Sequence, residues 1–358
     1  MILPQTYLSA LLLIVLSMIC WGSWANTTKL TGKWRFELYY FDYSFGVLLI
    51  ALLAAFTVGS AVMLGASDFT GFDFLDDVAK SGKRQIFFGL AAGVVFNLAN
   101  MLLVAAISVA GLAVAFPVGI GLALVIGVVS NYFINPQGNP TLLFVGTGLV
   151  VAAIVVDALA YRALALGKAQ SAPPPRPGKP VRMPSGWQIV WKGLLLSVIS
   201  GILMGCFYPL VELGKAGELG LGPYSIGLFF AVGVFLSTFL FNVYFMNLPV
   251  QGRPIQFSDY FEGTRKQHLL GVLGGAIWCV GTLANFAAAS APMKVQVGPA
   301  VSYAIGQGAT MVSALWGLLV WKEFAGGGTK VNSLVLLMLV LFGAGLGLIS
   351  LAPLYAAR

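Results

Sequence analysis

The chain alternates between long apolar runs and short polar segments, and these runs predict its architecture. Each run is about 20 residues long and apolar all round, as in a transmembrane α-helix. A transmembrane β-strand would be shorter and would alternate polar and apolar residues. The predicted helices cover residues 7–27, 37–64, 85–109, 112–133, 141–161, 189–211, 224–245, 269–290, 297–321 and 331–355. The pattern therefore predicts an all-α integral membrane protein of about ten transmembrane helices.

Composition agrees with a lipid environment. Hydrophobic residues make up 59% of the chain and charged residues 9%, against about 25% charged residues in a soluble domain. The net charge of +8 comes from basic residues in short loops beside apolar helices, where they set orientation, so no nucleic-acid partner is predicted. We expect a multi-pass protein of the inner or plasma membrane, with the lipid bilayer as its surroundings.

A proline-rich segment divides the chain into two parts. It contains Pro173-Pro174-Pro175 and Pro177, a composition typical of an extended linker. We predict a first five-helix repeat over 1–162, a linker over 163–188 and a second five-helix repeat over 189–358. Lysine and arginine concentrate in the linker and in the loops on its side of the membrane. The positive-inside rule then places the linker in the cytoplasm and both termini outside.

The two halves show a weak internal repeat. The matched positions are Gly22 with Gly205, Gly89 with Gly271, Gly93 with Gly275, and Pro117 with Pro299. Five helices per half make such repeats inverted, an arrangement typical of secondary transporters. The solute site of such proteins lies near the midplane, at segments interrupted by glycine or proline. The alternative for each proline is an ordinary place in the first helical turn.

Several functional classes find little support. The cysteines, Cys20, Cys206 and Cys279, lie in apolar runs without a plausible local disulfide partner. The one histidine, His268, is expected in a loop, which argues against a metal site or a catalytic relay. The run Gly326-Gly327-Gly328-Thr329-Lys330 lacks the spacing of a phosphate-binding loop. We therefore predict no cofactor, no metal and no enzymatic activity.

Polar and aromatic side chains inside the apolar runs are the candidates for solute binding. An amide in lipid needs a partner, which is either another helix or a solute. Tryptophan faces suit a sugar ring or a flat heterocycle, with an interfacial aromatic belt as the alternative. The predicted solute-binding residues are Trp21, Trp24, Asn26, Asn97, Asn100, Trp278, Asn285, Tyr303 and Gln307.

Two acidic residues at the start of the second helix are candidates for ion coupling. Asp42 lies deeper than Glu37 and is the better proton carrier, because its acidic form is tolerated in lipid whereas its ionised form needs water or a partner. Pairing with a neighbouring lysine is the alternative for Asp42. Pairing with Arg35 or Lys33 at the membrane surface is the alternative for Glu37.

Short motifs resemble a known transporter family. Those resembling ureide permeases in the first half are Gly22-Ser23-Trp24, Asp42-Tyr43-Ser44, Ala92-Gly93-Val94 with Asn97 and Asn100, and Asn131-Tyr132-Phe133. In the second half, Gly274-Gly275 with Trp278, and Trp316-Gly317 with Lys322-Glu323, resemble both ureide permeases and the L-rhamnose–proton symporter, of the glucose-ribose porter branch. Thr282 departs from the pattern, since asparagine is expected there. The resemblance implies the drug/metabolite transporter superfamily, with ten helices in two inverted halves.

These observations favour a secondary active transporter. The predicted activity is proton-coupled uptake of a small uncharged polar solute, such as a sugar, a ureide or a nucleobase. Sodium is the alternative coupling ion. A metabolite or drug exporter of the same fold is the alternative function, and a membrane-embedded enzyme is the third.

Overall fold

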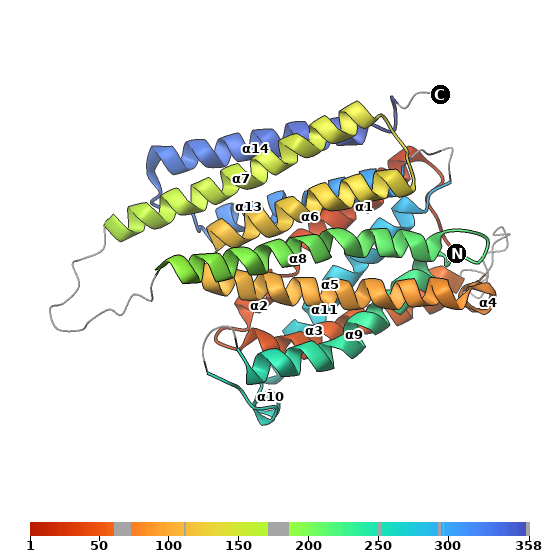
Figure 1. Ribbon diagram of the computed structural model, residues 1–358, viewed down its shortest axis with the longest axis horizontal. Helices are drawn as coiled ribbons and strands as arrows, with labels where there is room; N and C mark the ends of the chain where they lie inside the picture. The colour runs from red at the N-terminus through yellow and green to blue at the C-terminus, as the bar shows by residue number, and fades with distance from the viewer. Residues whose placement is uncertain are drawn as a thin grey trace.

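The computed structural model describes residues 1–60, 73–110, 112–170, 186–249, 253–292, 295 and 297–355. Every regular element among these residues is a helix (Figure 1). The helices are α1 (Tyr7–Ser23), α2 (Asn26–Leu30), α3 (Phe36–Phe56), α4 (Phe74–Lys80), α5 (Lys83–Ala110), α6 (Leu112–Ile134), α7 (Pro140–Gln170), α8 (Gly186–Lys215), α9 (Pro223–Asn247), α10 (Ser258–Phe261), α11 (Arg265–Ala289), α12 (Pro299–Gly306), α13 (Ala309–Leu319) and α14 (Gly328–Leu351).

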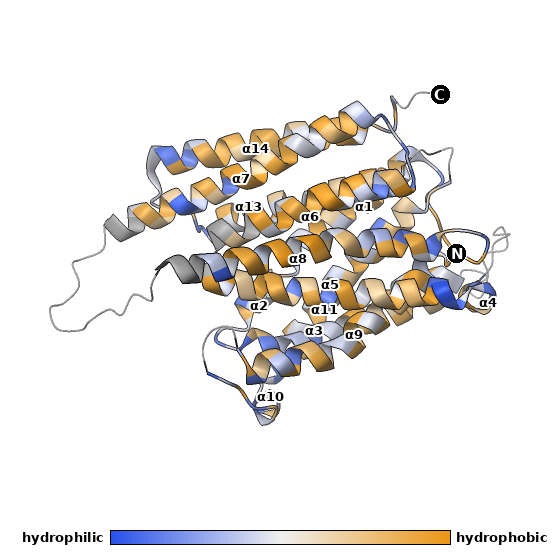
Figure 2. Ribbon diagram, viewed as in Figure 1, coloured by the Kyte–Doolittle hydropathy of each residue, from blue (hydrophilic) through white to orange (hydrophobic). Residues whose placement is uncertain are grey.

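Eight helical segments within the described part of the chain are long and apolar enough to cross a membrane. Apolar side chains cover the outside of the bundle as well as its core, with Leu8, Leu240 and Leu336 each more than 60% exposed. In Figure 2 the hydrophilic segments concentrate toward the two ends of the bundle, and the lengths between them are mostly hydrophobic. Such a surface is stable in lipid and not in water. The chain is a multi-pass membrane protein.

Two predicted segments have a different form in the structure. The predicted helix over 112–133 corresponds to α6. Its described apolar stretch, Val118–Ile134, is shorter than the eight long segments. The ninth was expected as one helix over 297–321, and this was wrong, because α12 ends at Gly306 and α13 begins at Ala309. Glycine flanks Gln307 on both sides, and glycine is costly inside a helix.

Other boundaries differ from the predicted ones at the loops. Helix α7 continues to Gln170, so the first eight residues of the predicted linker are helical, while 171–185 lie outside the described residues. Helix α11 begins at Arg265, because Thr264 and Gln267 form a capping box, so His268 lies in the first helical turn rather than in a loop. The apolar pattern could not predict the short helices α2, α4 and α10.

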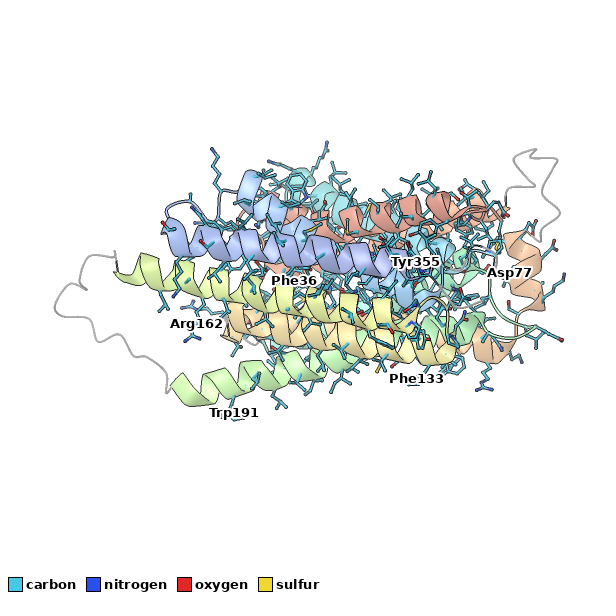
Figure 3. All side chains as sticks on the ribbon, turned by 90° about the horizontal axis from the view of Figure 1, so that it is seen from above. Phe36, Asp77, Phe133, Arg162, Trp191 and Tyr355 are labelled. Atoms are coloured by element: carbon cyan, nitrogen blue, oxygen red, sulfur yellow. The ribbon has the colours of Figure 1, made fainter. Side chains whose placement is uncertain are left out.

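The bundle has two distinct ends. Ile2 donates a backbone hydrogen bond to Val58 at 3.0 Å, and Asn139 bonds the carbonyl of Tyr355 at 3.1 Å, so both chain ends lie at one end. Figure 3 shows Asp77 and Tyr355 toward this end, and Arg162 and Trp191 toward the other. We call these the terminal end and the linker end.

The helices of the two halves interleave. Helix α1 packs on α11 and α5 packs on α8, while α3 packs on α11 and α5 on α9. Similarly, α6 packs on α8, and α1 packs on α12 and α13. Helices α7 and α14 lie side by side along one edge of the bundle (Figure 1). The five long helices of the first half can be matched in order with those of the second half: α1, α3, α5, α6 and α7 with α8, α9, α11, α12–α13 and α14. Exchanging the halves then turns each of these contacts into another one of them, and turns the contact of α7 with α14 into itself.

The glycines matched in the sequence occupy equivalent close contacts. A Cβ atom on Gly93 of α5 would lie 2.1 Å from the carbonyl oxygen of Phe230 on α9. A Cβ atom on Gly275 of α11 would lie 1.9 Å from the carbonyl oxygen of Tyr43 on α3. Both distances are far below van der Waals contact, so only glycine permits these helix pairs to approach so closely.

Candidate functional site

A cavity of about 140 Å³ lies inside the bundle, between helices of both halves. Helices α1, α5 and α6 of the first half and α8, α11 and the α12–α13 break of the second half contribute to it. Its lining residues are Trp21, Trp24, Phe96, Asn100, Leu103, Ile120, Met204, Phe207, Trp278, Gln307, Ala309 and Thr310. We call it the central cavity. Five of the nine predicted solute-binding residues line it: Trp21, Trp24, Asn100, Trp278 and Gln307.

One wall of the central cavity is aromatic. The rings of Phe96 and Trp278 stack at 4.5 Å with an interplanar angle of 29°, and Trp21 and Trp278 are nearly parallel at 6.2 Å. The indole nitrogen of Trp21 donates a hydrogen bond to Thr282 Oγ1 at 3.0 Å, which fixes the ring orientation. Thr282, where asparagine was expected, therefore supports the wall from behind. Flat, rigid walls of this kind bind the face of a ring.

Uncharged polar residues also line the central cavity. Asn100 donates a hydrogen bond from Nδ2 to the hydroxyl of Tyr40 at 3.0 Å, which orients its amide. The side chain of Gln307 lines the cavity, and its amide makes no hydrogen bond to another described side chain. The amide of Gln307 is therefore available to a solute.

The α12–α13 break brings backbone to the same place. The Gly308 N–H bonds the Ile305 carbonyl at 2.9 Å, and the Met311 N–H bonds the Gly308 carbonyl at 2.9 Å. These bonds span three residues rather than four, so the chain is tightened between the two short helices. A broken helix beside a cavity is a recurring feature of solute sites in transporters.

Two of the other predicted residues, Asn97 and Asn285, hold helices together. Nδ2 of Asn97 lies 2.8 Å from Ser237 Oγ and 3.1 Å from Thr238 Oγ1 on α9, and the side chain is fully buried. Asn285 is also fully buried; its Oδ1 accepts from the Tyr208 hydroxyl at 2.6 Å, and its Nδ2 donates to the Ser302 carbonyl at 3.1 Å. Neither residue lines the central cavity.

Asn26 and Tyr303 also lie away from the cavity lining. Asn26 accepts a hydrogen bond from the indole of Trp321 at 2.6 Å, and so ties α2 to the segment after α13. Tyr303 is fully buried, with its hydroxyl 3.3 Å from the carbonyl of Ala123. A Cβ atom on Gly127 would lie 2.2 Å from the Tyr303 ring, so this ring packs directly on α6.

The two acidic candidates have different surroundings. Glu37 forms a two-point ion pair with Arg35, with N–O distances of 2.6 and 3.1 Å. Both residues line a cavity of about 230 Å³ near the linker end. Asp42 is 6% exposed and has no lysine partner among the described residues; its Oδ2 lies 2.8 Å from His268 Nδ1, and its Oδ1 accepts from the Tyr260 hydroxyl at 2.6 Å.

His268 and Tyr260 are the functional candidates that the sequence did not indicate. Each lies more than 200 positions from Asp42, so no local pattern connects them. Burial and the hydrogen bond to Asp42 raise the pKa of the Tyr260 phenol well above its usual value, so this group stays protonated and donates. Within the described ranges, no three His, Cys, Asp or Glu side chains gather into a group suited to a metal ion.

Comparison with known proteins gives a consistent match. A family model described as ureide permease matches residues 39–170, from α3 to the end of α7. The chain is similar to the ureide permeases. Ureide permease 2 of Arabidopsis thaliana is 24% identical, with 96% of both chains covered, and ureide permease 4 of the same plant is 23% identical over 94% of this chain and 95% of its own length. The probable ureide permease A3 of Vigna unguiculata is 30% identical over 40% of this chain and 39% of its own.

Proposed function

We propose that this protein is a secondary active transporter that takes up a small, uncharged, ring-shaped solute with hydrogen-bonding groups. The observation that carries the proposal is the central cavity, which is lined both by an aromatic wall and by the uncharged residues Asn100 and Gln307. A cavity of about 150 Å³ in another protein accommodates benzene, so this one suits a single-ring solute. Among the residues that the structure describes, no Lys, Arg, Asp or Glu lines the cavity, and an ionic solute would therefore lack a partner there.

Within that class we propose a ureide as the preferred solute. The similarity to ureide permeases over nearly the whole chain supports this choice. A ureide ring carries N–H and C=O groups along its edge, and amide side chains can donate to and accept from such an edge. Sugars and nucleobases remain members of the test panel, since both have a face suited to tryptophan.

The proposed coupling ion is the proton, with Asp42 as its carrier. Asp42 lies within the membrane-crossing segment Phe36–Ser60, and its partners His268 and Tyr260 come from α11 and α10. A proton on Asp42 removes the negative charge that both partners bind. The contact between α3, α10 and α11 therefore differs between the two protonation states, which is the condition for a proton to shift a conformational equilibrium.

We further propose that the protein has ten membrane-crossing segments in two inverted repeats. The exchangeable contacts between the halves and the equivalent contacts of Gly93 and Gly275 support a two-fold relation. In this arrangement, the linker is cytoplasmic and the central cavity lies at the axis that relates the repeats, where solute sites of inverted-repeat transporters occur.

Transport by purified protein in vesicles tests the proposal. Uptake of labelled allantoin (a ureide), uracil and L-rhamnose is measured with an acidic exterior, with equal pH on both sides, and in protein-free vesicles. We expect allantoin to accumulate above its external concentration only with the acidic exterior. If none of these solutes enters, and none raises the melting temperature of the folded protein, the proposed function is wrong. Exit of preloaded solute without concentrative uptake would favour an exporter.

A further inference from the structure

A second cavity, of about 430 Å³, lies at the terminal end of the bundle. It is formed where α6 and α8 end, where α9 begins and where α11 ends, and Asn135, Pro223 and Ser290 are among its lining residues. Its volume falls within the range of about 300–1,000 Å³ typical of small-molecule sites. We call it the outer cavity.

A buried ion pair lines the outer cavity. Nζ of Lys215 donates a hydrogen bond to Glu212 Oε1 at 2.7 Å, and the two side chains are only 10% and 6% exposed. Charged groups are rarely so buried without a functional or structural reason. Ion-selective pores use rings of like charge, whereas this pair has one positive and one negative group, so it does not select for an ion.

The pair retains hydrogen-bonding capacity toward the cavity. Lys215 has three N–H donors and Glu212 has a second carboxylate oxygen, whereas one bond joins them. Neighbouring groups are already engaged, because Ser290 Oγ donates to the Phe286 carbonyl and the Gly222 N–H donates to Asp77 Oδ2. A solute in this cavity would therefore find its strongest partners at Glu212 and Lys215.

The chemistry of the pair selects a class of ligand. A neutral group with N–H and C=O side by side, such as an amide or a ureido group, can donate to the carboxylate and accept from the ammonium at the same time. A hydroxyl group can also donate and accept, but its O–H bond rotates, so it does not hold a donor and an acceptor side by side in fixed directions. An ion would leave an unpaired charge beside two side chains that are only 10% and 6% exposed, which is costly.

One face of helix α8 runs from the central cavity to the outer cavity. Met204, Tyr208, Val211 and Lys215 follow at spacings of four, three and four residues and so share one face of the helix. Met204 lines the central cavity and Lys215 lines the outer cavity, about 16 Å apart along the helix axis. Tyr208, fully buried and bonded to Asn285, lies between them on this face, so a solute passing from one cavity to the other would have to displace its ring.

We propose that the outer cavity is a second solute site, in which Glu212 and Lys215 bind the amide-like edge of a neutral ureido or amide compound. This inference rests on the proposed function, since it assigns the site to the same transport path. The solute occupies the outer site first, on the terminal side of Tyr208, and then passes to the central cavity.

The test uses cysteine labelling in the full-length protein with Cys20, Cys206 and Cys279 replaced by alanine. Ser290→Cys reports on the outer cavity and Thr310→Cys on the central one. The label is a charged, membrane-impermeant maleimide, and the competing solutes are allantoin and L-rhamnose. At a solute concentration of about ten times the dissociation constant, allantoin should slow labelling of Ser290→Cys about tenfold, because only about a tenth of the sites stay empty. L-Rhamnose should not slow it.

Two variants identify the groups responsible. The double variant Glu212→Gln and Lys215→Gln leaves no unpaired charge and should remove the protection of Ser290→Cys. The central-cavity variant Gln307→Leu should retain it. If the double variant does not fold, Lys215→Arg, which keeps the ion pair, should fold and retain protection, and the comparison of allantoin with L-rhamnose in the parent still decides the proposal.

The outcomes separate the outer site from the proposed function. Protection of Thr310→Cys together with unprotected Ser290→Cys would reject the outer site and leave the transport proposal standing. The outer site would also be rejected if Gln307→Leu removed the protection of Ser290→Cys and the double variant kept it. Failure of allantoin to protect either position, together with no uptake of any solute, would reject the proposed function.

Discussion

Nδ1 of His268 lies 2.8 Å from Oδ2 of Asp42, and this partly buried contact joins the first turn of α11 to α3. Tyr260 of α10 donates to the other carboxylate oxygen of Asp42. The ring of Trp34 packs against His268 with centroids 4.7 Å apart, so the imidazole is held in place. A carboxylate, an imidazole and a phenol from three helices thus form one cluster whose contacts depend on the charge of Asp42.

We expect Asp42→Asn to uncouple solute movement from protons. The amide cannot ionise, so proton binding no longer changes the contacts with His268 and Tyr260. The variant should still exchange solute across the membrane but should not accumulate it against a gradient. Uptake and counterflow in vesicles, with and without an imposed pH difference, measure the two properties separately.

Glu37→Gln serves as the control for Asp42→Asn. Glu37 lies at the start of the same helix, but its ion pair with Arg35 is at the linker end, and it should affect coupling less. Undiminished pH-driven accumulation by Asp42→Asn, with loss in Glu37→Gln, would move the coupling site to Glu37. If both variants retain pH-driven accumulation of solute, neither carboxylate has a role in proton coupling.

Gln307→Leu should weaken solute binding while leaving stability nearly unchanged. The Gln307 amide faces the central cavity and bonds no other described side chain, so leucine breaks no hydrogen bond that we observe within the protein. The lost bond to the solute should raise KM about tenfold, which corresponds to about 1.4 kcal/mol. Concentration-dependent uptake gives KM, and the melting temperature without solute serves as the control. An unchanged KM would remove Gln307 from the site.

Asn97→Leu should lower stability while leaving solute binding nearly unchanged. Asn97 lies away from the central cavity lining, and its amide bonds Ser237 and Thr238 on α9. Its loss should lower stability by roughly 0.6–2 kcal/mol, because interhelical hydrogen bonds in membranes are worth about 0.6 kcal/mol on average in a folded protein and about 1–2 kcal/mol in model peptides. Thermal unfolding in detergent measures this change. A normal melting temperature with a raised KM would instead place Asn97 in solute binding.

Tyr208→Phe should loosen the closure between the two cavities. The change removes the hydrogen bond to Asn285 and keeps the ring, so the core remains filled. In the alanine background described above, Thr310→Cys should react faster with an impermeant maleimide applied from the terminal end. Ser302→Ala, which also removes a bond to Asn285 but lies on α12, serves as a comparison. Equal labelling rates in Tyr208→Phe and the parent would contradict a closing role.

Topology is tested by reporters at the two ends. We expect the linker to be cytoplasmic, because lysine and arginine concentrate at the linker end, and the termini to lie outside. A reporter active only outside the cytoplasm should work after residue 358 and fail when inserted in the linker. The opposite pattern would invert the orientation without changing the fold.

The sequence alone determined the membrane class and most helical segments. In lipid, each backbone N–H and C=O must bond within the protein, and a helix satisfies this within its own segment, so a continuous run of about 20 apolar residues is enough to predict a helix. The matched glycines could also be found in the sequence, because Gly93 and Gly275 meet the same local need for close helix contact. The membrane class and the helical segments depend on residues near one another in the chain, whereas the partners of the glycines, Phe230 and Tyr43, are distant in the sequence.

Only the tertiary structure decided which polar residues share a space. Apolar residues cover both the lipid-facing and the core-facing sides of each helix, so the sequence does not show which side faces inward. Asn97 and Asn100 are three residues apart on α5, yet one bonds α9 and the other lines the central cavity. The contact of His268 with Asp42 and the break after Gly306 depend on neighbours from distant parts of the chain. Packing between helices decides which of these residues lie together, and the sequence of one helix alone does not predict that packing.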